Sequence, residues 1–260
     1  MTVQKPQQPI LKVEHVCKAF GGVKTAQDVS FEVHPGQIMG LIGPNGAGKT
    51  TLLNLISGIY DVDAGEIWIN GRNVTKTPAY QRARMGLGRT FQAPRFLYRS
   101  TIRDNLLLGT DLGNHMGYLK SFFGAKGLDF DSELAELMKI VGFTFDWKSD
   151  INSLPYGQRK LLEIVRSLLT HPKIMLVDEP AAGLNSKEID RAVELLEYAA
   201  RVHKIGVVLI EHSMDMVMNL CDDIVVLSFG KVIATGKPEQ VSTNRDVIEA
   251  YLGRDFDVAD

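Results

Sequence analysis

Hydrophobic and polar residues alternate in three short stretches near the beginning of the chain. A period of two predicts half-buried strands, and the stretches cover residues 10–16, 29–33 and 66–70. The pair Asn70-Gly71 at the end of the third stretch favours a hairpin turn. Between these stretches, the continuous apolar run 38–42 predicts a buried strand. That run leads through a glycine-rich turn into a helix expected over residues 50–59.

Farther along the chain the hydrophobic period becomes that of a helix. Helices are predicted over residues 132–141 and 160–169, and residues 110–131 are interpreted as a helical insert with irregular connections. Strand and helix patterns then alternate, with strands expected over residues 174–177, 206–210, 224–228 and 231–235. The helices between and after them are expected over residues 186–202, 213–220 and 245–252. This alternation predicts an α/β fold with a largely parallel sheet.

Composition and charge narrow the classes of function. The 260 residues include 29 Lys and Arg against 31 Asp and Glu, for a net charge of −2. This balance lacks the basic excess that general nucleic-acid binding uses, so no nucleic-acid partner is expected. Two cysteines provide neither a disulfide framework nor the spacing of a zinc site. The absence of an apolar run of about 18 residues, and of a signal-peptide pattern at the start, indicates a cytoplasmic location.

A phosphate-binding loop is the most specific motif in the sequence. The pattern G-x-x-x-x-G-K-[ST] is matched by Gly43, Pro44, Asn45, Gly46, Ala47, Gly48, Lys49 and Thr50. Glycines let backbone N–H groups turn toward phosphate oxygens, and the following helix presents its positive end. Lys49 is placed to reach the β- and γ-phosphates, Thr50 to ligate Mg²⁺, and Thr51 to reach another phosphate oxygen. Because a strand is predicted before the loop and a helix after it, a mere connecting loop is a poor alternative.

An acidic pair, Asp178-Glu179, follows the apolar stretch 174–177. The carboxyl ends of parallel strands are where α/β sheets bind ligands. Asp178 is therefore a candidate for holding Mg²⁺, and Glu179 for activating a water that attacks the γ-phosphate. Two solvated acids at the end of a strand are the alternative, which the phosphate loop disfavours. His212, after the apolar stretch 206–210, and Gln92 are weak signals by themselves.

The segment Leu154-Pro155-Tyr156-Gly157-Gln158 gives the chain a recognisable family likeness. It resembles the signature motif of ATP-binding cassette (ABC) ATPases, usually Leu-Ser-Gly-Gly-Gln, and it lies 20 residues before Asp178. Other motifs of that family occur in the same order. Phe20, 29 residues before Lys49, is similar to the aromatic residue that stacks on adenine, Gln92 to the Q-loop, residues 182–185 to the D-loop and His212 to the switch histidine. The resemblance covers residues 10–253.

The resemblance implies a P-loop NTPase core with an antiparallel β-subdomain and an inserted α-helical subdomain. It implies domain boundaries of 10–93 for the first part of the nucleotide-binding core, 94–158 for the helical subdomain ending in the signature motif, and 159–253 for the second part of the core. Residues 1–9 and 254–260 are expected to be flexible tails.

The family also implies roles for the site residues. Two chains pack head to tail, with ATP between Lys49 of one chain and the signature motif of the other. Glu179 is implied as the general base, His212 as a γ-phosphate contact and Gln92 as a sensor of Mg²⁺ and the attacking water. The implied catalytic residues are Glu179, His212, Gln92 and Lys49. ATP contacts are implied for Phe20, for Gly43 to Thr51, and for Pro155, Tyr156, Gly157 and Gln158, and Mg²⁺ contacts for Thr50, Gln92 and Asp178.

Two departures from the family pattern bear on activity and on classification. Pro155 replaces the usual serine, so a hydroxyl contact to phosphate is missing, and Asn185 stands where Asp is usual in the D-loop. Neither removes Lys49, Asp178 or Glu179, so an active ATPase is still expected. The segments 154–158, 162–164 and 179–185, and the ending 238–253, are similar to the ATP-binding subunit of branched-chain amino acid importers.

The leading hypothesis is therefore an ATP-hydrolysing importer subunit for branched-chain or other hydrophobic amino acids. The implied partners are a second ATP-binding subunit (identical or a paralogue), two membrane permease subunits and, indirectly, an extracytoplasmic substrate-binding protein. Its implied location is the cytoplasmic face of the inner membrane, bound peripherally. Alternatives are the ATPase of a urea or amide importer or of a lipopolysaccharide-extracting transporter. A non-transport ABC ATPase of DNA maintenance and a P-loop kinase are less favoured, because the first needs longer chains and the second leaves residues 154–158 unexplained.

Overall fold

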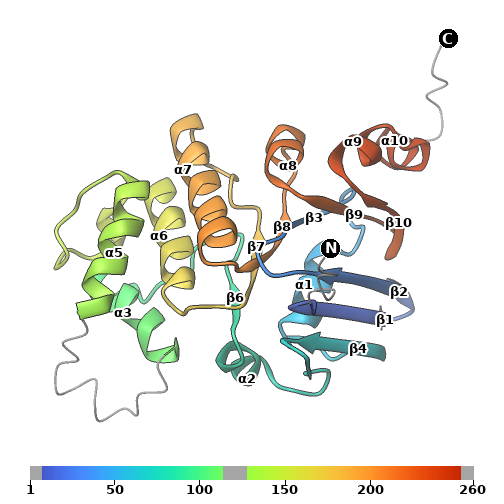
Figure 1. The fold of residues 1–260 in the computed structure, drawn as a ribbon, viewed down its shortest axis with the longest axis horizontal. Coiled ribbons are helices and arrows are strands. Elements are labelled where there is room, and N and C mark those ends of the chain that lie inside the picture. Colours follow the sequence, from blue (N-terminus) through green and yellow to red (C-terminus); the bar gives the residue numbers. More distant parts are fainter. Residues whose placement is uncertain (1–7, 114–127, 253–260) are drawn as a thin grey trace, which may run out of the picture.

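The computed structural model describes residues 8–113 and 128–252. The strands form two sheets, which Figure 1 shows at the centre and on the right of the molecule, with the helices α3, α5 and α6 on the left. The first sheet is antiparallel, in the order β2-β1-β4-β5. Its strands are β1 Leu11–Phe20, β2 Val23–Val33, β4 Ala64–Ile69 and β5 Arg72–Asn73. Ile69 pairs with Arg72, so the hairpin predicted at Asn70-Gly71 is confirmed.

The second sheet has six strands in the order β10-β9-β3-β8-β7-β6. The five strands from β9 to β6 run parallel, and only β10 is antiparallel to its neighbour. The strands are β3 Ile38–Ile42, β6 Leu87–Arg89, β7 Ile174–Asp178, β8 Gly206–Ile210, β9 Asp223–Ser228 and β10 Lys231–Gly236. The predicted α/β class with a mostly parallel sheet is confirmed.

Alternate residues of the parallel strands enter two different cores, because successive side chains of a strand point to opposite faces. In β7, Ile174 and Leu176 face the core shared with helix α1, Lys49–Ile56, and with the antiparallel sheet. Met175 and Val177 face the opposite core, which helices cover. The continuous apolar runs of the sequence therefore reflect burial on both faces of the sheet.

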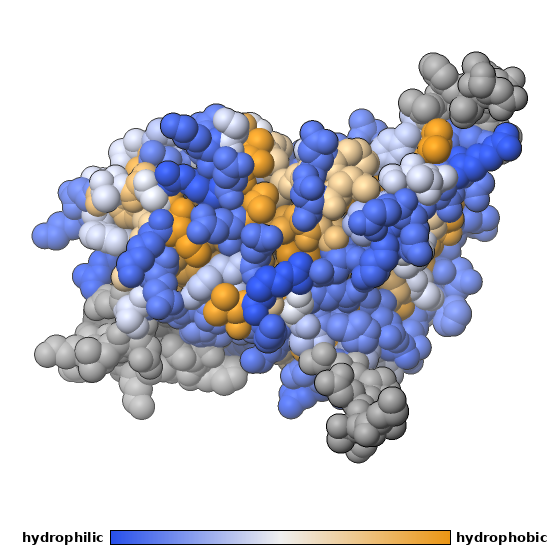
Figure 2. Space-filling model, turned by 45° about the horizontal axis from the view of Figure 1, so that its top comes forward, coloured by the Kyte–Doolittle hydropathy of each residue, from blue (hydrophilic) through white to orange (hydrophobic). Residues whose placement is uncertain are grey.

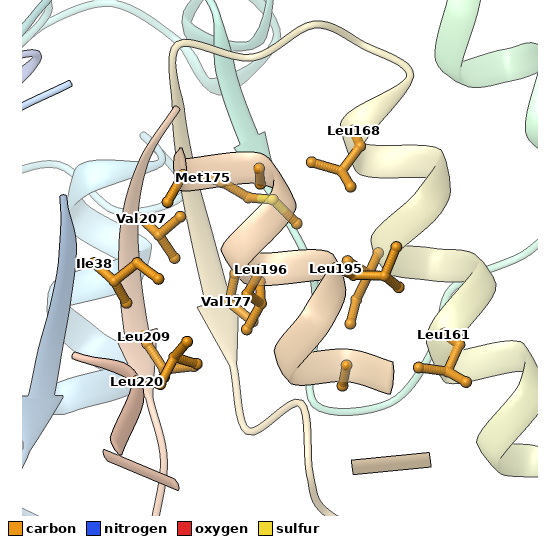
Figure 3. Close-up of a cluster of buried hydrophobic side chains, with 14 of the residues drawn as sticks. Ile38, Leu161, Leu168, Met175, Val177, Leu195, Leu196, Val207, Leu209 and Leu220 are labelled. Carbon is orange, nitrogen blue, oxygen red and sulfur yellow. The ribbon is translucent and has the colours of Figure 1, made fainter. Parts of the chain in front are cut away.

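The helix-covered core is shown in Figure 3. Side chains from three strands, among them Ile38, Val177 and Leu209, meet Leu195 and Leu196 of the helix Ser186–Glu197, called α7. Leu161 and Leu168 approach from a second helix, α6, which spans Tyr156–Leu168. The remaining helices are α2 Ala79–Arg84, α3 Ile102–Gly113, α5 Leu128–Val141, α8 Met214–Leu220, α9 Pro238–Ser242 and α10 Arg245–Leu252. Two single turns, Ile151–Ser153 and the π-helical Tyr198–Val202, complete the helical structure described.

Several predicted boundaries differ from the structure for local reasons. The helix expected over 50–59 ends at Ile56, because Ser57 caps it and Gly58 follows with φ +75°. The helix expected from Lys160 begins four residues earlier, at Tyr156. Helix α2 and strand β6 have no predicted counterpart, since both are too short to show a clear period. Of the predicted insert 110–131, residues 114–127 lie outside the described residues, as do most of the predicted tails.

The outer surface is mainly polar on the face shown in Figure 2, where apolar residues form separate patches between charged ones. Within residues 8–113 and 128–252, no helix has the length and apolar character that crossing a bilayer requires.

Candidate active site

The phosphate loop connects β3 to α1 and is packed tightly against two other backbone segments. A Cβ atom on Gly43 would lie 2.1 Å from the Leu227 carbonyl oxygen, and one on Gly48 would lie 2.2 Å from the Thr25 carbonyl oxygen. Gly48 also has φ +105°, a conformation that costs other residues energy. The loop therefore needs glycine at these positions to make its turn, whatever it binds.

The beginning of α1 is available to an anion. Gly48, its N-cap, provides no side-chain cap, and the first turn contains no acidic residue. The first N–H groups of a helix have no partner inside it, and the helix dipole makes this end positive. Thr50 is exposed in this turn and Thr51 is half-buried. These properties suit the phosphate groups of a nucleotide.

Lys49 places a cation inside the loop. Its side chain is buried, and its Nζ atom donates to the carbonyl oxygens of Gly43 at 2.7 Å and Pro44 at 3.1 Å. Burial lowers the pKa of Lys49, while the nearby carboxylates of Glu179 and Asp178 raise it. The ammonium is thus held between the loop and the acidic pair, where a phosphate would lie beside it.

Glu179 is bracketed by two side chains from neighbouring strands. Gln92 Nε2 donates to its Oε2 atom at 2.8 Å, and His212 Nε2 lies 2.9 Å from its Oε1 atom. Glu179 follows β7, Gln92 comes shortly after β6, and His212 follows β8, and β6, β7 and β8 are adjacent in the sheet. The parallel order therefore brings together three predicted residues that are far apart in the chain.

Asp178 is the more buried member of the acidic pair. Burial raises its pKa, and the Arg89 guanidinium acts in the opposite direction. The described residues contain no cluster of three His, Cys, Asp or Glu side chains suited to a metal ion. The oxygen donors expected for Mg²⁺, namely Thr50, Asp178 and the Gln92 amide, nevertheless fit the ion, which prefers few protein ligands together with phosphate oxygens and water. Because Gln92 donates its NH₂ to Glu179, its amide oxygen stays available for such a role.

The last three signature residues, Tyr156 to Gln158, lie in the first turn of α6. Pro155 is the N-cap with φ −54°, an angle that suits proline at a helix start, and Gln158 lies in the first turn. The Tyr156 hydroxyl donates to the Gln92 carbonyl oxygen at 3.2 Å. A Cβ atom on Gly157 would lie 2.3 Å from the Glu188 carboxylate. In this chain the motif therefore contacts the Q-loop and α7. The N–H groups of its first turn lie at the start of a helix, where they have no partner inside the helix and suit an anion.

Asn185, one of the two departures from the family pattern, has a local structural role. Its side chain accepts a hydrogen bond from the Glu188 N–H at 3.1 Å, and the Glu188 carboxylate accepts from the Asn185 N–H at 3.0 Å. This reciprocal pair is a capping box at the start of α7. The amide oxygen of Asn is as good an N-cap as a carboxylate, so the substitution keeps this helix start.

Phe20 is 42% exposed, at the end of β1. Its ring meets the Tyr60 ring edge to face, with 5.2 Å between the two ring centres. The Lys18 Nζ atom lies 5.2 Å from the centre of the Phe20 ring. A cavity of about 660 Å³ is lined by residues of β1, β2 and β10, including Lys18, Ala26 and Lys231. Ala26 and Lys231 directly follow Thr25 and Gly230, whose backbones contact the phosphate loop. The cavity is thus next to the phosphate loop, and Phe20 is not among its lining residues.

Two buried charged residues that the motifs did not single out adjoin the site. Glu211 accepts hydrogen bonds from the N–H groups of Ala181 at 2.6 Å and His212 at 3.0 Å. Lys160 donates to the backbone carbonyl oxygens of Glu179 and, at 3.0 Å, of Ala182. The sequence offered one signal for each residue. Lys160 is a charged residue within an amphipathic helix, and Glu211 directly follows an apolar strand.

Comparison with known families gives a consistent result. The ABC transporter family matches residues 26–182, and the family described as branched-chain amino acid ATP-binding cassette transporter matches residues 231–257. The chain is 39% identical over 252 residues to the high-affinity branched-chain amino acid transport ATP-binding protein LivG of Escherichia coli, covering 95% of this chain and 98% of that one. It is 38% identical over 256 residues to BraF of Pseudomonas aeruginosa, a protein of the same description, with the same coverage.

Solved structures share the fold. A structure described as the ADP conformation of MJ1267, an ATP-binding cassette of an ABC transporter, has a TM-score of 0.80 and 30% identity, covering 95% of this chain and all of that one. A second one, described as the dimeric post-hydrolysis state of the cassette MJ0796 bound to ADP and Pi, has a TM-score of 0.76 and 22% identity and covers 88% of this chain and 98% of that one. The second likeness shows the fold alone.

Proposed function

This chain belongs to the ABC transporter family as an ATP-hydrolysing subunit, and from that premise we propose that it powers the uptake of branched-chain amino acids through separate membrane subunits. The family match removes the kinase alternative. The substrate class rests on the descriptions of LivG and BraF and on the matched segment 231–257.

The observation that carries the proposed chemistry is the bracketed carboxylate of Glu179. With ATP on the phosphate loop, Glu179 accepts a proton from the water that attacks the γ-phosphate in line. Gln92 and His212 hold the two oxygens of that carboxylate, which fixes its direction. Lys49 and the start of α1 stabilise the charge that develops on the phosphate oxygens.

Mg²⁺ fits the same arrangement. Thr50, Asp178 and the Gln92 amide oxygen are the residues that would hold it. When bound it would neutralise charge on the β- and γ-phosphates. Phe20 is proposed to stack on the adenine, and its exposed ring is compatible with that role.

We propose that two such subunits bind ATP between them, with Pro155 to Gln158 of one chain facing the nucleotide on the other. The start of α6 supports this, because it has no side-chain cap and its first N–H groups have no partner inside the helix, so they can donate to an anion. The dimeric cassette of the same fold is in keeping with it. The partner subunit is a second copy of this chain or a paralogue.

The membrane partners are proposed to dock on the helical part of the molecule. Residues 94–158 are proposed to act there as a subdomain, between core segments 10–93 and 159–253. Its exposed residues include large apolar side chains, namely Leu97, Tyr98, Leu108 and Trp147. Docking to permease subunits would place the chain peripherally at the cytoplasmic face of the membrane, and the extracytoplasmic binding protein would contact it only through them.

The test uses Glu179→Gln, which keeps the size of the side chain but removes the base. The variant is expected to bind ATP normally, to hydrolyse it at least about 100-fold more slowly, and to form an ATP-dependent dimer. Glu194→Gln, at an exposed acid of α7, is the matched control and should behave as the original protein. Near-normal hydrolysis by Glu179→Gln would remove Glu179 from its role.

The substrate is tested separately. The subunit, reconstituted in proteoliposomes with its permeases and binding protein, is expected to accumulate radiolabelled leucine, isoleucine or valine when ATP is supplied on its side of the membrane. Uptake of urea or short amides in place of these amino acids would contradict the proposed substrate class.

A further inference from the structure

Lys160 is a buried cation that is bonded to backbone rather than to an acid. It is only 2% exposed, and its ammonium donates to the carbonyl oxygens of Glu179 and Ala182. Among the ion pairs of the described residues, none includes Lys160. Removing a lysine from water costs several kcal/mol, roughly, unless its surroundings compensate. Because Lys160 forms no direct ion pair, its two hydrogen bonds to backbone carbonyl oxygens have to offset much of this cost.

The segment that Lys160 holds is the turn that begins at Glu179. Glu179 has φ +49°, which is uncommon for a residue with a side chain and costs about 1–2 kcal/mol. The turn's own hydrogen bond, from the Ala182 N–H to the Glu179 carbonyl, is long at 3.3 Å. Such a conformation persists only when the surroundings impose it. Lys160 supplies two charge-assisted hydrogen bonds to the two ends of this turn.

Glu211 acts on the same turn with the opposite charge. It is 4% exposed, and its carboxylate accepts the Ala181 N–H at 2.6 Å while also accepting the His212 N–H. The cation therefore binds carbonyl oxygens of the turn, and the anion binds an N–H of the same turn. Burial lowers the pKa of Lys160, and the charge of Glu211 is the largest of the influences that raise it.

We propose that Lys160, assisted by Glu211, is a positioning residue for ATP hydrolysis, which holds the left-handed backbone of Glu179 so that its carboxylate points to the attacking water. This inference rests on the proposed function of Glu179. Lys160 lies on α6, one turn after Tyr156, so the helix that carries the signature motif also holds the base of its own chain. A shift of α6 on docking to a partner would therefore reach Glu179 through this side chain.

The experiment replaces Lys160 by Met, which has nearly the same length and no N–H donor. The nucleotide affinity is expected to stay within about twofold, because Lys49 and the phosphate loop are untouched, while kcat falls at least about tenfold. In the Glu179→Gln background the same substitution is expected to have no further effect on kcat, because a residue that acts through Glu179 has nothing left to position. Lys76→Met, which removes an exposed lysine, is the matched control and should change neither quantity.

Each outcome decides the matter. A kcat within about twofold of the original protein for Lys160→Met, or an equal loss of kcat with and without the Glu179 carboxylate, would overturn the inference. An active Glu179→Gln variant would instead overturn the proposed function, so the two failures are distinguishable. If Lys160→Met does not fold, Glu211→Gln tests the assisting residue instead, since the amide oxygen can accept only one of the Ala181 and His212 N–H groups and the NH₂ group would face the other. Unchanged kcat in Glu211→Gln would then refute the proposed positioning of the Glu179 backbone.

Discussion

The imidazole Nε2 atom of His212 lies 2.9 Å from Oε1 of Glu179, although the two residues are 33 positions apart in the chain. The contact exists because β7 and β8 are adjacent and parallel, with Asp178 paired to Ile210, so both strands end at the same level. His212 is about half exposed and Glu179 is largely shielded. The pair is therefore open to solvent on the His212 side.

Replacing His212 by Ala is expected to lower kcat for ATP hydrolysis about 100-fold or more, because the carboxylate loses one of its two side-chain contacts. ATP binding should be retained, since the phosphate loop is unchanged. Steady-state hydrolysis and equilibrium binding of a fluorescent ATP analogue measure the two effects. His203→Ala, which alters a histidine that packs on Tyr198 away from the site, should leave kcat as it was.

Gly48 and Gly46 offer a matched pair in the phosphate loop. Both have positive φ, but a Cβ atom on Gly48 would lie 2.2 Å from the Thr25 carbonyl oxygen, whereas one on Gly46 meets nothing within 4 Å. Gly46→Ala should cost only the conformational strain, about 1–2 kcal/mol of unfolding free energy. Gly48→Ala should cost clearly more, because the Thr25 backbone has to move. Urea unfolding of both variants tests this, and equal losses would show that the clash relaxes freely.

Glu163 is expected to make stability depend on pH. It is 1% exposed, and burial raises its pKa to about 7 from 4.5, although the Arg95 and Phe91 N–H groups and Arg166 oppose the shift. Between these two values the folded protein holds a proton that the unfolded chain has lost. The stabilisation from this group is therefore complete below about pH 4.5 and is lost as the pH rises through about 7.

The rise of the Glu163 pKa from 4.5 to about 7 corresponds to roughly 3 kcal/mol of unfolding free energy, as an upper value. Glu163→Gln cannot lose a proton, so it should gain up to that amount over the original protein at about pH 8 and little at about pH 5. Thermal or chemical unfolding at the two pH values measures the difference. A gain that is the same at both would mean that Glu163 titrates normally in the folded chain.

The capping box at Asn185 predicts an asymmetry between two substitutions. Asn185→Ala removes the acceptor for the Glu188 N–H and should cost about 1 kcal/mol of unfolding free energy. Asn185→Asp, the residue usual at this position, keeps the acceptor and should stay within about 0.5 kcal/mol of the original. Chemical denaturation compares the two directly. A large loss with Asp would indicate that the added charge, and not the cap, governs this position.

Local order along the chain was enough to identify the motifs and the class of fold. The phosphate loop is recognised from the glycines and Lys49 at their fixed spacing, because few sequences can form a tight turn around a phosphate. The buried strands at residues 38–42 and 174–178 are predicted from nearly unbroken apolar runs, because a strand covered on both faces needs apolar residues on both. The branched-chain family likeness also came from contiguous segments, which need no knowledge of which strands are neighbours.

The strand order, and with it the side-chain contacts of the site, was decided only by the tertiary structure. Gln92, Glu179 and His212 are separate weak signals until the order β6, β7, β8 places them around one carboxylate. Lys160 and Glu211 read as ordinary charges on a helix and a strand, and only packing shows that both are buried on the turn after β7. Periodicity reports which face of an element is buried but not what lies against it, because that depends on contacts between residues far apart in the chain. The sequence by itself therefore determined the class of chemistry, whereas the fold decided which side chains hold the base in place.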